Sequence, residues 1–406
     1  MHTINDTFLM ILRSALLGQT ADVEPAPEQW PELFRLADSH KLLPMIFEAV
    51  FPRLRASDPA LAARVKAQVR SQVIAQTLRT EEFLALNRKL REAGIDALVV
   101  KGIVCRSLYP RPDHRLSADE DVLIRPEQFD KSHQVMTAFG MNTAESDPSA
   151  YEVPYRKPGS PLYIELHKHL FPPQSEAYGD LNRFFRSSHD HAVSLEVPGG
   201  TVRTLEPTEH LFYLICHAFK HFLHSGFGIR QVCDIVLFAN HYGSSIDWDV
   251  LLENCWAIRA DRFAAAIFRI GSCHLTFDPD RAGYPPAWRE IAVDEGPMLE
   301  DLLCAGIYGS AQRSRLHSSS ITLNAVAAEK QSKRSGALST IFPPARKLTG
   351  RYPYLKKHPY LLPAAWCSRL VTYAKETRQL QGNRTADALK LGAERIELLK
   401  QYGILR

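Results

Sequence analysis

Two short apolar segments and the basic loop between them constrain the fold of this chain more than any other feature. Residues 95–100 (IDALVV) are apolar and rich in β-branched side chains between flanking glycines, which is typical of a strand buried on both faces. Residues 122–124 (VLI) form a second such run, and Asp119 and Asp121 directly precede it. Because side chains alternate along a strand, both carboxylates should point to the same face of a sheet. That face is a candidate metal site.

The chemistry of such a pair follows from its charge. Adjacent carboxylates repel one another, and a hard divalent cation such as Mg²⁺ between them makes their pairing favourable. Bound Mg²⁺ could hold the phosphates of a nucleotide and activate an attacking oxygen, as in phosphoryl and nucleotidyl transfer. The alternative is a solvated strand end. A buried strand on each side favours the metal site, because a surface turn would need neither.

A third carboxylate lies on a predicted hairpin. Residues 151–171 (YEVPYRKPGSPLYIELHKHLF) read as two strands joined by a Pro-Gly turn,. The second strand should bring Tyr163, Glu165 and His167 to one face and its apolar residues to the other,. From the residues alone, Glu165 reads as an exposed strand glutamate beside Lys168.

Basic residues surround the first acidic pair. The loop at residues 109–115 (YPRPDHR) carries two arginines, and planar guanidinium groups suit bidentate contacts with phosphate. A helix beginning near Gly102 would add backbone donors and a favourable dipole. We therefore expect Lys101, Gly102 and Arg115 to bind phosphate, with solvated loop charges as the alternative for the arginines.

Three histidines share one face of a later predicted helix. His217, His221 and His224 are spaced at i, i+4 and i+7,. The segment lacks the Glu of a His-Glu-x-x-His zinc motif and has no nearby cysteine pair, so zinc is not favoured. Two interpretations stay open for this face: it lines a nucleotide or acceptor cleft, with Arg230 or Asp234 tying the next helix to it, or it is a hydrogen-bonded structural face.

Taken in order, these motifs resemble the uncharacterised bacterial nucleotidyltransferases of the DNA polymerase β-like superfamily. The resemblance covers about the first 240 residues and, more loosely, the C-terminal segment. It is carried by Lys101-Gly102, Tyr109-Pro110, Arg115, Asp119-x-Asp121, Glu165-x-His167, His217, His221, Arg230 and Asp234. The resemblance implies catalytic and metal-binding roles for Asp119, Asp121 and Glu165. It implies nucleotide contacts for Lys101, Gly102, Arg115, His167, His217 and His221.

Two positions depart from the superfamily pattern. The superfamily places Gly-Gly or Gly-Ser at the head of its first helix, where this chain has Lys101-Gly102. The residue between the aspartates is usually apolar, and here it is Glu120. A core-facing strand position should not carry an unpaired carboxylate, so either that face is open or Glu120 is itself functional.

The resemblance and the patterns together predict an α+β (mixed α/β) protein, with a small mixed sheet in a mostly helical chain. We expect helices at 1–93, a nucleotidyltransferase core at 94–205, a helical domain lining the cleft at 206–310, a basic connector at 311–350 and a helical tail at 351–406. The implied reaction is Mg²⁺-dependent transfer of a nucleotide, most simply AMP from ATP, to an unknown acceptor with release of pyrophosphate. A catalytically degenerate nucleotide sensor or partner-binding protein is the main alternative.

Composition limits the partners and the compartment. The net charge of +4 on 406 residues is too small for an obligate nucleic-acid binder,, although an RNA-modifying factor that uses the connector and tail is a second alternative. Seven cysteines without paired short spacing indicate neither disulfides nor zinc,. No cationic leader and no apolar run of about twenty residues is present. We therefore expect a cytoplasmic protein that does not insert into membranes.

Overall fold

The computed structural model of the chain describes residues 3–23, 25–145, 147, 149–173, 175, 177–224, 226–305, 345–348, 352–368 and 385–405. The chain forms two compact units. The first comprises Met1–Ser175, Gly179–Phe219 and Phe227–Ile307, and the second comprises Glu176–Tyr178, Lys220–Gly226 and Tyr308–Arg406. The predicted basic connector at 311–350 lies outside the described residues, except for Ala345–Leu348. The predicted domain boundaries stay a prediction.

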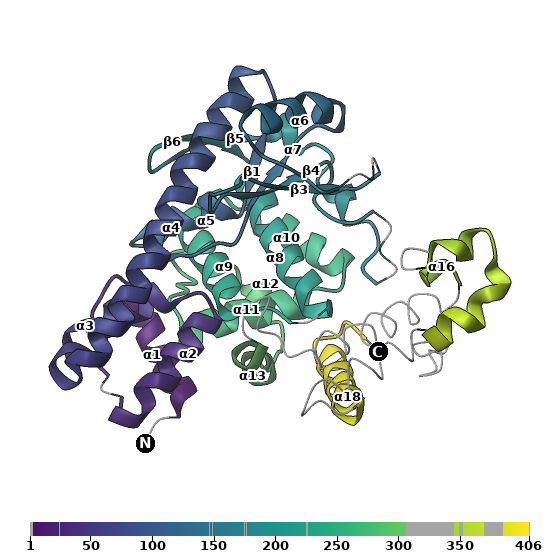
Figure 1. Ribbon diagram of the computed structural model, residues 1–406. Helices are drawn as coiled ribbons and strands as arrows, with labels where there is room; N and C mark the ends of the chain where they lie inside the picture. The colour runs from purple at the N-terminus through teal and green to yellow at the C-terminus, as the bar shows by residue number, and fades with distance from the viewer. Residues whose placement is uncertain are drawn as a thin grey trace. The chain divides into compact units, whose positions relative to one another are not determined.

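Four helices precede the sheet, as the apolar spacing predicted (Figure 1). They are α1 (Ile4–Leu16), α2 (Trp30–Ser39), α3 (Leu43–Ser57) and α4 (Pro59–Glu92). α2 and α3 are separate helices, because Lys41 between them has a positive φ of 58°. Such a backbone conformation ends a right-handed helix.

The sheet has four strands and is mixed, as predicted. They are β1 (Leu98–Val100), β2 (Glu120–Leu123), β3 (Glu152–Arg156) and β4 (Tyr163–His167), in the order β1-β2-β4-β3. β3 and β4 form the predicted hairpin. β1 is antiparallel to β2, and β2 is parallel to β4. The two central strands therefore carry the Asp-x-Asp pair and the Glu-x-His pair side by side.

The two faces of this sheet differ in polarity. Val122, Tyr155, Ile164 and Leu166 are fully buried, or nearly so, on one face. Tyr163, Glu165 and His167 alternate with the apolar residues of β4 and point to the other face, as the sequence predicted. On the apolar side, Arg79 of α4 donates hydrogen bonds to the backbone carbonyl oxygens of Pro161 and Ser117. Asp121 and Glu165 thus share the face opposite that apolar layer.

The remaining elements lie between or after the sheet strands, except for the turn η1, which precedes α2. The helices are α5 (Gly102–Arg106), α6 (Phe129–Ala138), α7 (Ser188–His191), α8 (Pro207–His224), α9 (Ile229–Tyr242), α10 (Trp248–Ala257), α11 (Asp261–His274), α12 (Pro286–Arg289) and α13 (Gly296–Ala305). A second hairpin is β5 (Val193–Val197) with β6 (Gly200–Thr204). Single 3₁₀ turns are η1 (Pro27–Gln29), η2 (Pro112–His114), η3 (Pro126–Gln128), η4 (Leu181–Phe184) and η5 (Gly243–Ser245).

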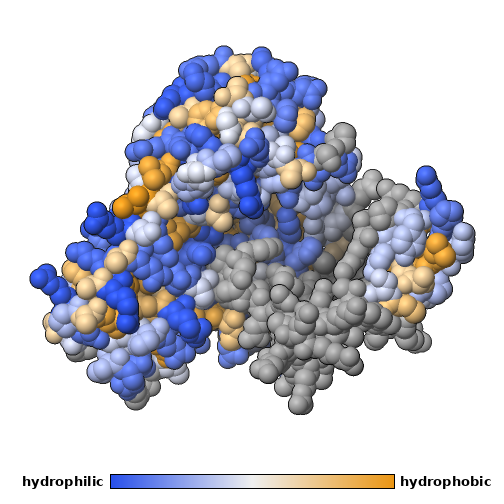
Figure 2. Space-filling view, in the orientation of Figure 1, coloured by the Kyte–Doolittle hydropathy of each residue, from blue (hydrophilic) through white to orange (hydrophobic). Residues whose placement is uncertain are grey.

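The described part of the second unit is helical. It contains α16 (Ala345–Leu348), α18 (Thr385–Gln401) and the 3₁₀ turns η6 (Pro353–Lys356) and η7 (Pro359–Leu361). Leu348, Leu355 and Ala365 pack into a small apolar cluster there. Across the described residues, no helix combines the length and apolarity needed to cross a bilayer. The face in Figure 2 is largely hydrophilic, with small scattered apolar patches.

The turn between β1 and α5 has an unusual backbone. Lys101 has φ 64° and Gly102 has φ 30°, conformations that residues with a Cβ rarely adopt. A Cβ atom on Gly102 would lie 1.9 Å from Oε2 of Glu120. Glu120 is fully buried and forms an ion pair of 2.7 Å with Arg106. The turn therefore requires glycine at position 102.

We expect Gly102→Ala to lower the free energy of unfolding by about 2–4 kcal/mol, because it adds a clash with a buried carboxylate to an unfavourable φ. Gly140→Ala is the matched control, since Gly140 has φ 87° but nothing within 4 Å of its added Cβ. It should cost about 1 kcal/mol. Urea denaturation measures both, and equal losses would contradict this account of the turn.

Candidate active site

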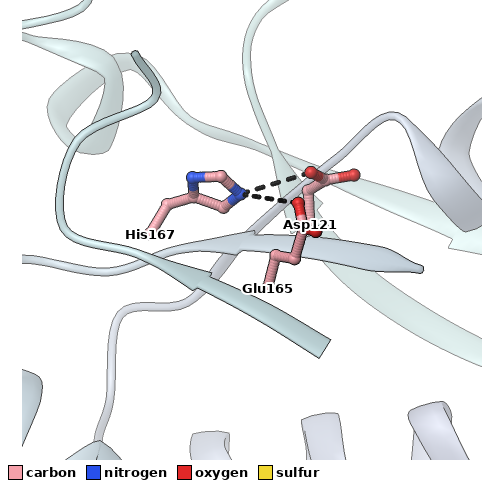
Figure 3. A group of neighbouring side chains, drawn as sticks. All are labelled: Asp121, Glu165 and His167. Carbon is pink, nitrogen blue, oxygen red and sulfur yellow. Dashed lines mark hydrogen bonds and ion pairs between the residues drawn. The ribbon is translucent and has the colours of Figure 1, made fainter. Parts of the chain in front are cut away.

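Three side chains from the two central strands meet on the polar face of the sheet. Asp121 on β2 is directly opposite Glu165 on β4, and His167 follows two residues later. Nε2 of His167 lies 3.2 Å from Oδ1 of Asp121 and 3.9 Å from Oε2 of Glu165 (Figure 3). One ligand atom from each of the three residues lies within 4.8 Å of the others. This spacing allows a single metal ion to contact all three.

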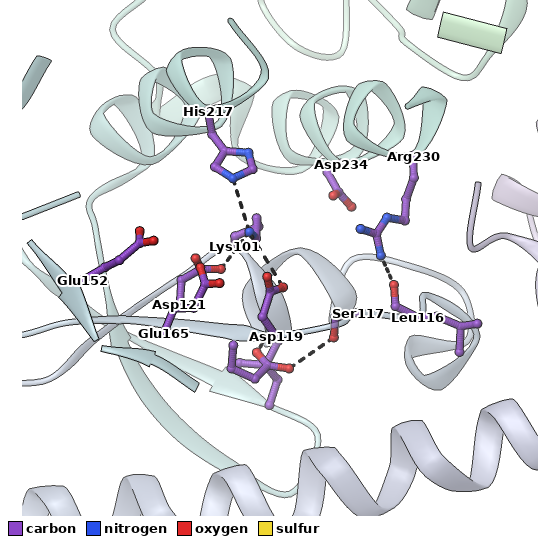
Figure 4. Close-up of polar contacts among 12 residues, drawn as sticks. Lys101, Leu116, Ser117, Asp119, Asp121, Glu152, Glu165, His217, Arg230 and Asp234 are labelled. Atoms are coloured by element: carbon purple, nitrogen blue, oxygen red, sulfur yellow. Dashed lines mark hydrogen bonds and ion pairs between the residues drawn. The ribbon is translucent and has the colours of Figure 1, made fainter. Parts of the chain in front are cut away.

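Lys101 brings a positive charge to the same carboxylates. Its Nζ atom is 2.8 Å from Oδ2 of Asp121 and 4.0 Å from Oδ1 of Asp119. It also lies 3.4 Å from Nε2 of His217 on α8 (Figure 4). The unusual backbone at Lys101 turns the chain immediately after β1, so the side chain reaches across from the outer strand to the acidic pair. Both aspartates are thus engaged by one ammonium group.

Burial and charge set the protonation states of this group. Burial raises the pKa of Asp121, but Lys101 and His167 lower it by more, so it lies well below its usual range. Burial lowers the pKa of Lys101, and the two aspartates raise it well above its usual value. Burial and then the charges of Asp121 and Asp119 raise the pKa of Glu165 to about 7. Glu165 therefore changes charge near neutral pH.

The donor set fits a divalent cation. Oδ2 of Asp121 is buried, and the Lys101 ammonium lies 2.8 Å from it. Carboxylate oxygens are the ligands that Mg²⁺ prefers, and an added imidazole nitrogen is also compatible with transition metals. Asp119, Asp121 and Glu165 were predicted as ligands. The contacts bring Asp121 and Glu165 together with His167, while Asp119 stands beside Lys101 with its side chain 25% exposed.

Glu120 has neither of the two roles that the sequence left open. It points to the apolar side of β2, where Oε1 accepts a hydrogen bond from Arg106 at 2.7 Å. Its Oε2 accepts one from the backbone N–H of Ile103 at 2.9 Å. Burying a carboxylate is tolerable only with such partners. Glu120 is therefore a structural residue that holds the start of α5.

These contacts argue against the phosphate cradle expected at Gly102. The backbone N–H of Ile103 is bonded to Glu120, and the N–H of Lys101 donates to Nε2 of His210 at 3.2 Å. Both donors that flank Gly102 are therefore already used inside the protein. Gly102 has a steric role at the turn, and the expected backbone contact with phosphate is not supported.

Arg115 is also engaged inside the protein. Its Nε and Nη2 atoms donate to the two carboxylate oxygens of Asp234 on α9, at 3.1 and 2.6 Å. Tyr109 donates a third hydrogen bond to Asp234, and Arg115 is 1% exposed. Arg230 bonds to the backbone carbonyl of Leu116. The expected phosphate contact of Arg115 is thus not supported, because this guanidinium group ties the loop at 109–116 to α9.

Residues 26–276, more than half of the chain, match the sequence profile of a family described as an uncharacterised nucleotidyltransferase. The chain belongs to this family. That assignment confirms the resemblance found in the sequence and makes nucleotidyl transfer the class of reaction to explain.

Two solved structures are similar to the nucleotidyltransferase. The solution structure of the antibiotic-resistance factor ANT(2″)-Ia covers 48% of this chain and 95% of its own, with 14% identity and a TM-score of 0.33. An antigenic nucleotidyltransferase-like protein from Paracoccidioides brasiliensis covers 48% and 91%, with 17% identity and a TM-score of 0.29. No match was found among curated proteins.

Of the three histidines on the predicted helix face, His217 contacts the site. His217 contacts Lys101, as described above. His221 is buried and belongs to the second unit, so its expected nucleotide contact stays a prediction. Sequence reasoning gave no role to His210 or Glu152, although Oε2 of Glu152 lies 3.8 Å from Nδ1 of His167. The register of the predicted hairpin could have found Glu152, because Glu152 on β3 pairs with His167 on β4.

We expect Glu165 to contribute a decline in the stability of the nucleotidyltransferase in EDTA as pH rises from about 4.5 to about 7. The buried His40 and His210, whose pKa values burial lowers to about 4 and about 3, contribute a rise over part of that range,. The folded protein holds the Glu165 proton up to about pH 7, whereas the unfolded chain releases it near pH 4.5,. Folding is therefore favoured by this group at low pH and loses that contribution as the carboxylate ionises. Glu165→Gln should remove roughly 1–3 kcal/mol of this decline, measured by urea unfolding across the pH range.

Part of the decline should remain in that variant, because burial also raises the pKa of Glu209 to about 7. Glu127→Gln, at an exposed position, is the control and should leave the curve unchanged. A curve for Glu165→Gln that superposes on the wild-type curve would refute this assignment.

Proposed function

We propose that this nucleotidyltransferase transfers AMP from ATP to an acceptor hydroxyl group and releases pyrophosphate, with Mg²⁺ bound at the polar face of the sheet. The observation that carries the proposal is the register of β2 and β4, which sets Asp121 directly beside Glu165. Asp119 adds a further carboxylate two residues away on the same side. A cluster of acidic groups on one sheet face is costly without a cation, and nucleotidyl transfer is a reaction that uses one.

The acidic side chains would hold the metal. Asp119, Asp121 and Glu165 supply carboxylate oxygens, and His167 fixes the orientation of Asp121 through its contact of 3.2 Å. When bound, Mg²⁺ would neutralise phosphate charge and align the attacking and leaving oxygens. The low pKa of Asp121 keeps that carboxylate ionised at every physiological pH. Asp121 is therefore always ready to bind a cation.

Lys101 and Glu165 would act on opposite sides of the reacting phosphate. The Lys101 ammonium group, 11% exposed, can hold the phosphates that leave as pyrophosphate,. His217 lies against that ammonium group and would help to position it. Glu165 can accept the proton of the acceptor hydroxyl through a carboxylate oxygen that the metal leaves free.

The proposed organisation extends beyond these residues. Residues 94–205 would form the catalytic core, and 206–310 would contribute His217 and one wall of the cleft, as the sequence predicted. All seven cysteines are free thiols, which supports a reducing compartment such as the cytoplasm. The degenerate-sensor alternative drew on Glu120, and the ion pair of Glu120 with Arg106 removes that support.

We expect Mg²⁺-dependent ATP binding, measured by calorimetry, to weaken at least about tenfold in Asp119→Asn, because a carboxylate ligand is lost. Asp119 is partly exposed and should tolerate the change better than the buried Asp121. Asp130→Asn, at an exposed position on α6, is the control for loss of one negative charge. Binding that is equally tight without Mg²⁺, or equal in all three proteins, would count against the proposal.

A further inference from the structure

A cavity lies at the hairpin turn that joins β3 to β4, close in the chain to the acidic cluster. It has a volume of about 810 Å³, and its walls include Ala118, Arg156, Lys157 and Tyr163. Ala118 directly precedes Asp119 in the chain, and Tyr163 precedes Glu165 by two residues on β4. The cavity therefore opens beside the proposed reaction centre.

The sheet register places this cavity on one side of the carboxylates. Arg156 on β3 pairs with Tyr163 on β4, and the next row across the sheet pairs Glu165 with Asp121. β3 is one outer strand, whereas Lys101 follows β1, the other outer strand. The carboxylates on the central strands thus separate Lys101 from the cavity.

In-line displacement at phosphorus determines which substrate can occupy each side. The attacking oxygen and the leaving oxygen lie on opposite sides of the phosphorus atom. If Lys101 holds the leaving phosphates, the acceptor must approach from the β4–β3 side. Glu165, the proposed base, faces that approach. This step rests on the proposed function.

The charge of the cavity then restricts the acceptor. Among the described residues that line it, two are cationic and none is a carboxylate. Arg156 is exposed, and its guanidinium group stacks on Tyr163 at 5.1 Å from the ring centroid. Lys157 lies 4.4 Å from the ring centroid of Phe139 and 3.6 Å from Oε2 of Glu82. The stacked guanidinium group keeps its edge available for bidentate hydrogen bonds.

The wall of the cavity is fixed before any ligand binds. Arg79 of α4 donates to the carbonyl oxygens of Pro161 and Ser117, so one side chain joins the hairpin turn to the segment before Asp119. Ser160 donates to Glu82 of the same helix at 2.5 Å. A cavity on a rigid helix and hairpin needs little ordering when it binds.

We infer that this cavity is the acceptor site and that the acceptor is a hydroxyl compound carrying a phosphate or carboxylate group, bound by Arg156 beside Tyr163. The anionic group contacts the guanidinium edge, and the hydroxyl points towards Glu165. A polycationic acceptor is disfavoured by the same charges.

Ribose 5-phosphate, gluconate and neutral ribose are the probes, added to protein saturated with Mg²⁺ and α,β-methylene ATP so that the donor site is filled. Saturation-transfer NMR and calorimetry should show binding of at least one anionic probe and at least tenfold weaker binding of ribose. Arg156→Gln should weaken the anionic probe at least tenfold, because a charged hydrogen bond is lost, and should leave the affinity for the ATP analogue unchanged.

Arg183→Gln is the matched control, since Arg183 is also exposed and stacks on Phe184 at 4.6 Å outside this cavity. It should bind every probe as the wild type does. If no anionic probe binds, or if both arginine variants weaken its binding equally, the inference is overturned. In that case the proposed function still stands as long as binding of the ATP analogue depends on Asp119. Loss of that Asp119 dependence overturns the proposed function itself.

Discussion

The site depends on keeping the Asp121 carboxylate ionised where almost no water reaches it. Asp121 is 2% exposed, and the Lys101 ammonium at 2.8 Å together with His167 at 3.2 Å makes its charge tolerable. An isolated ionised carboxylate in such a place would instead take up a proton. Glu165 lies next to the same centre without a direct cationic partner at that distance, and its pKa is raised to about 7. Asp121, whose charge has two close cationic partners, stays ionised, whereas Glu165, which lacks such partners, can take up a proton near neutral pH.

Two further buried ion pairs hold the framework of the site. Glu120 joins Arg106 and the start of α5, and Arg115 joins Asp234 on α9. Buried pairs add little net stability, but losing one partner leaves an uncompensated charge and costs about 3–5 kcal/mol. Their geometry is specific, so they fix how α5 and α9 approach the sheet. Charged residues near this centre therefore divide into those that build it and those that face its substrates.

The sequence predicted the elements of the site better than their partners. Strand alternation and β-branched runs are local signals, so the hairpin and the shared face of Glu165 and His167 could be predicted, while the mixed sheet was expected from the family resemblance. The parallel pairing of β2 with β4 could not, because it depends on how distant segments meet. The same limit applies to Arg115: a basic residue in a loop is expected to be solvated, and its partner Asp234 lies 119 positions away. Glu120 likewise gave no local sign that Arg106 would neutralise it.

The position of the cation is the central claim of this account. Crystals grown with Mn²⁺ and α,β-methylene ATP would locate it directly, because Mn²⁺ scatters anomalously far more strongly than the light atoms of protein and water. We expect the strongest peak among the carboxylates of Asp119, Asp121 and Glu165, with the analogue's phosphates on the side of Lys101. A peak elsewhere, or phosphates bound with no ion at these carboxylates, would contradict the account.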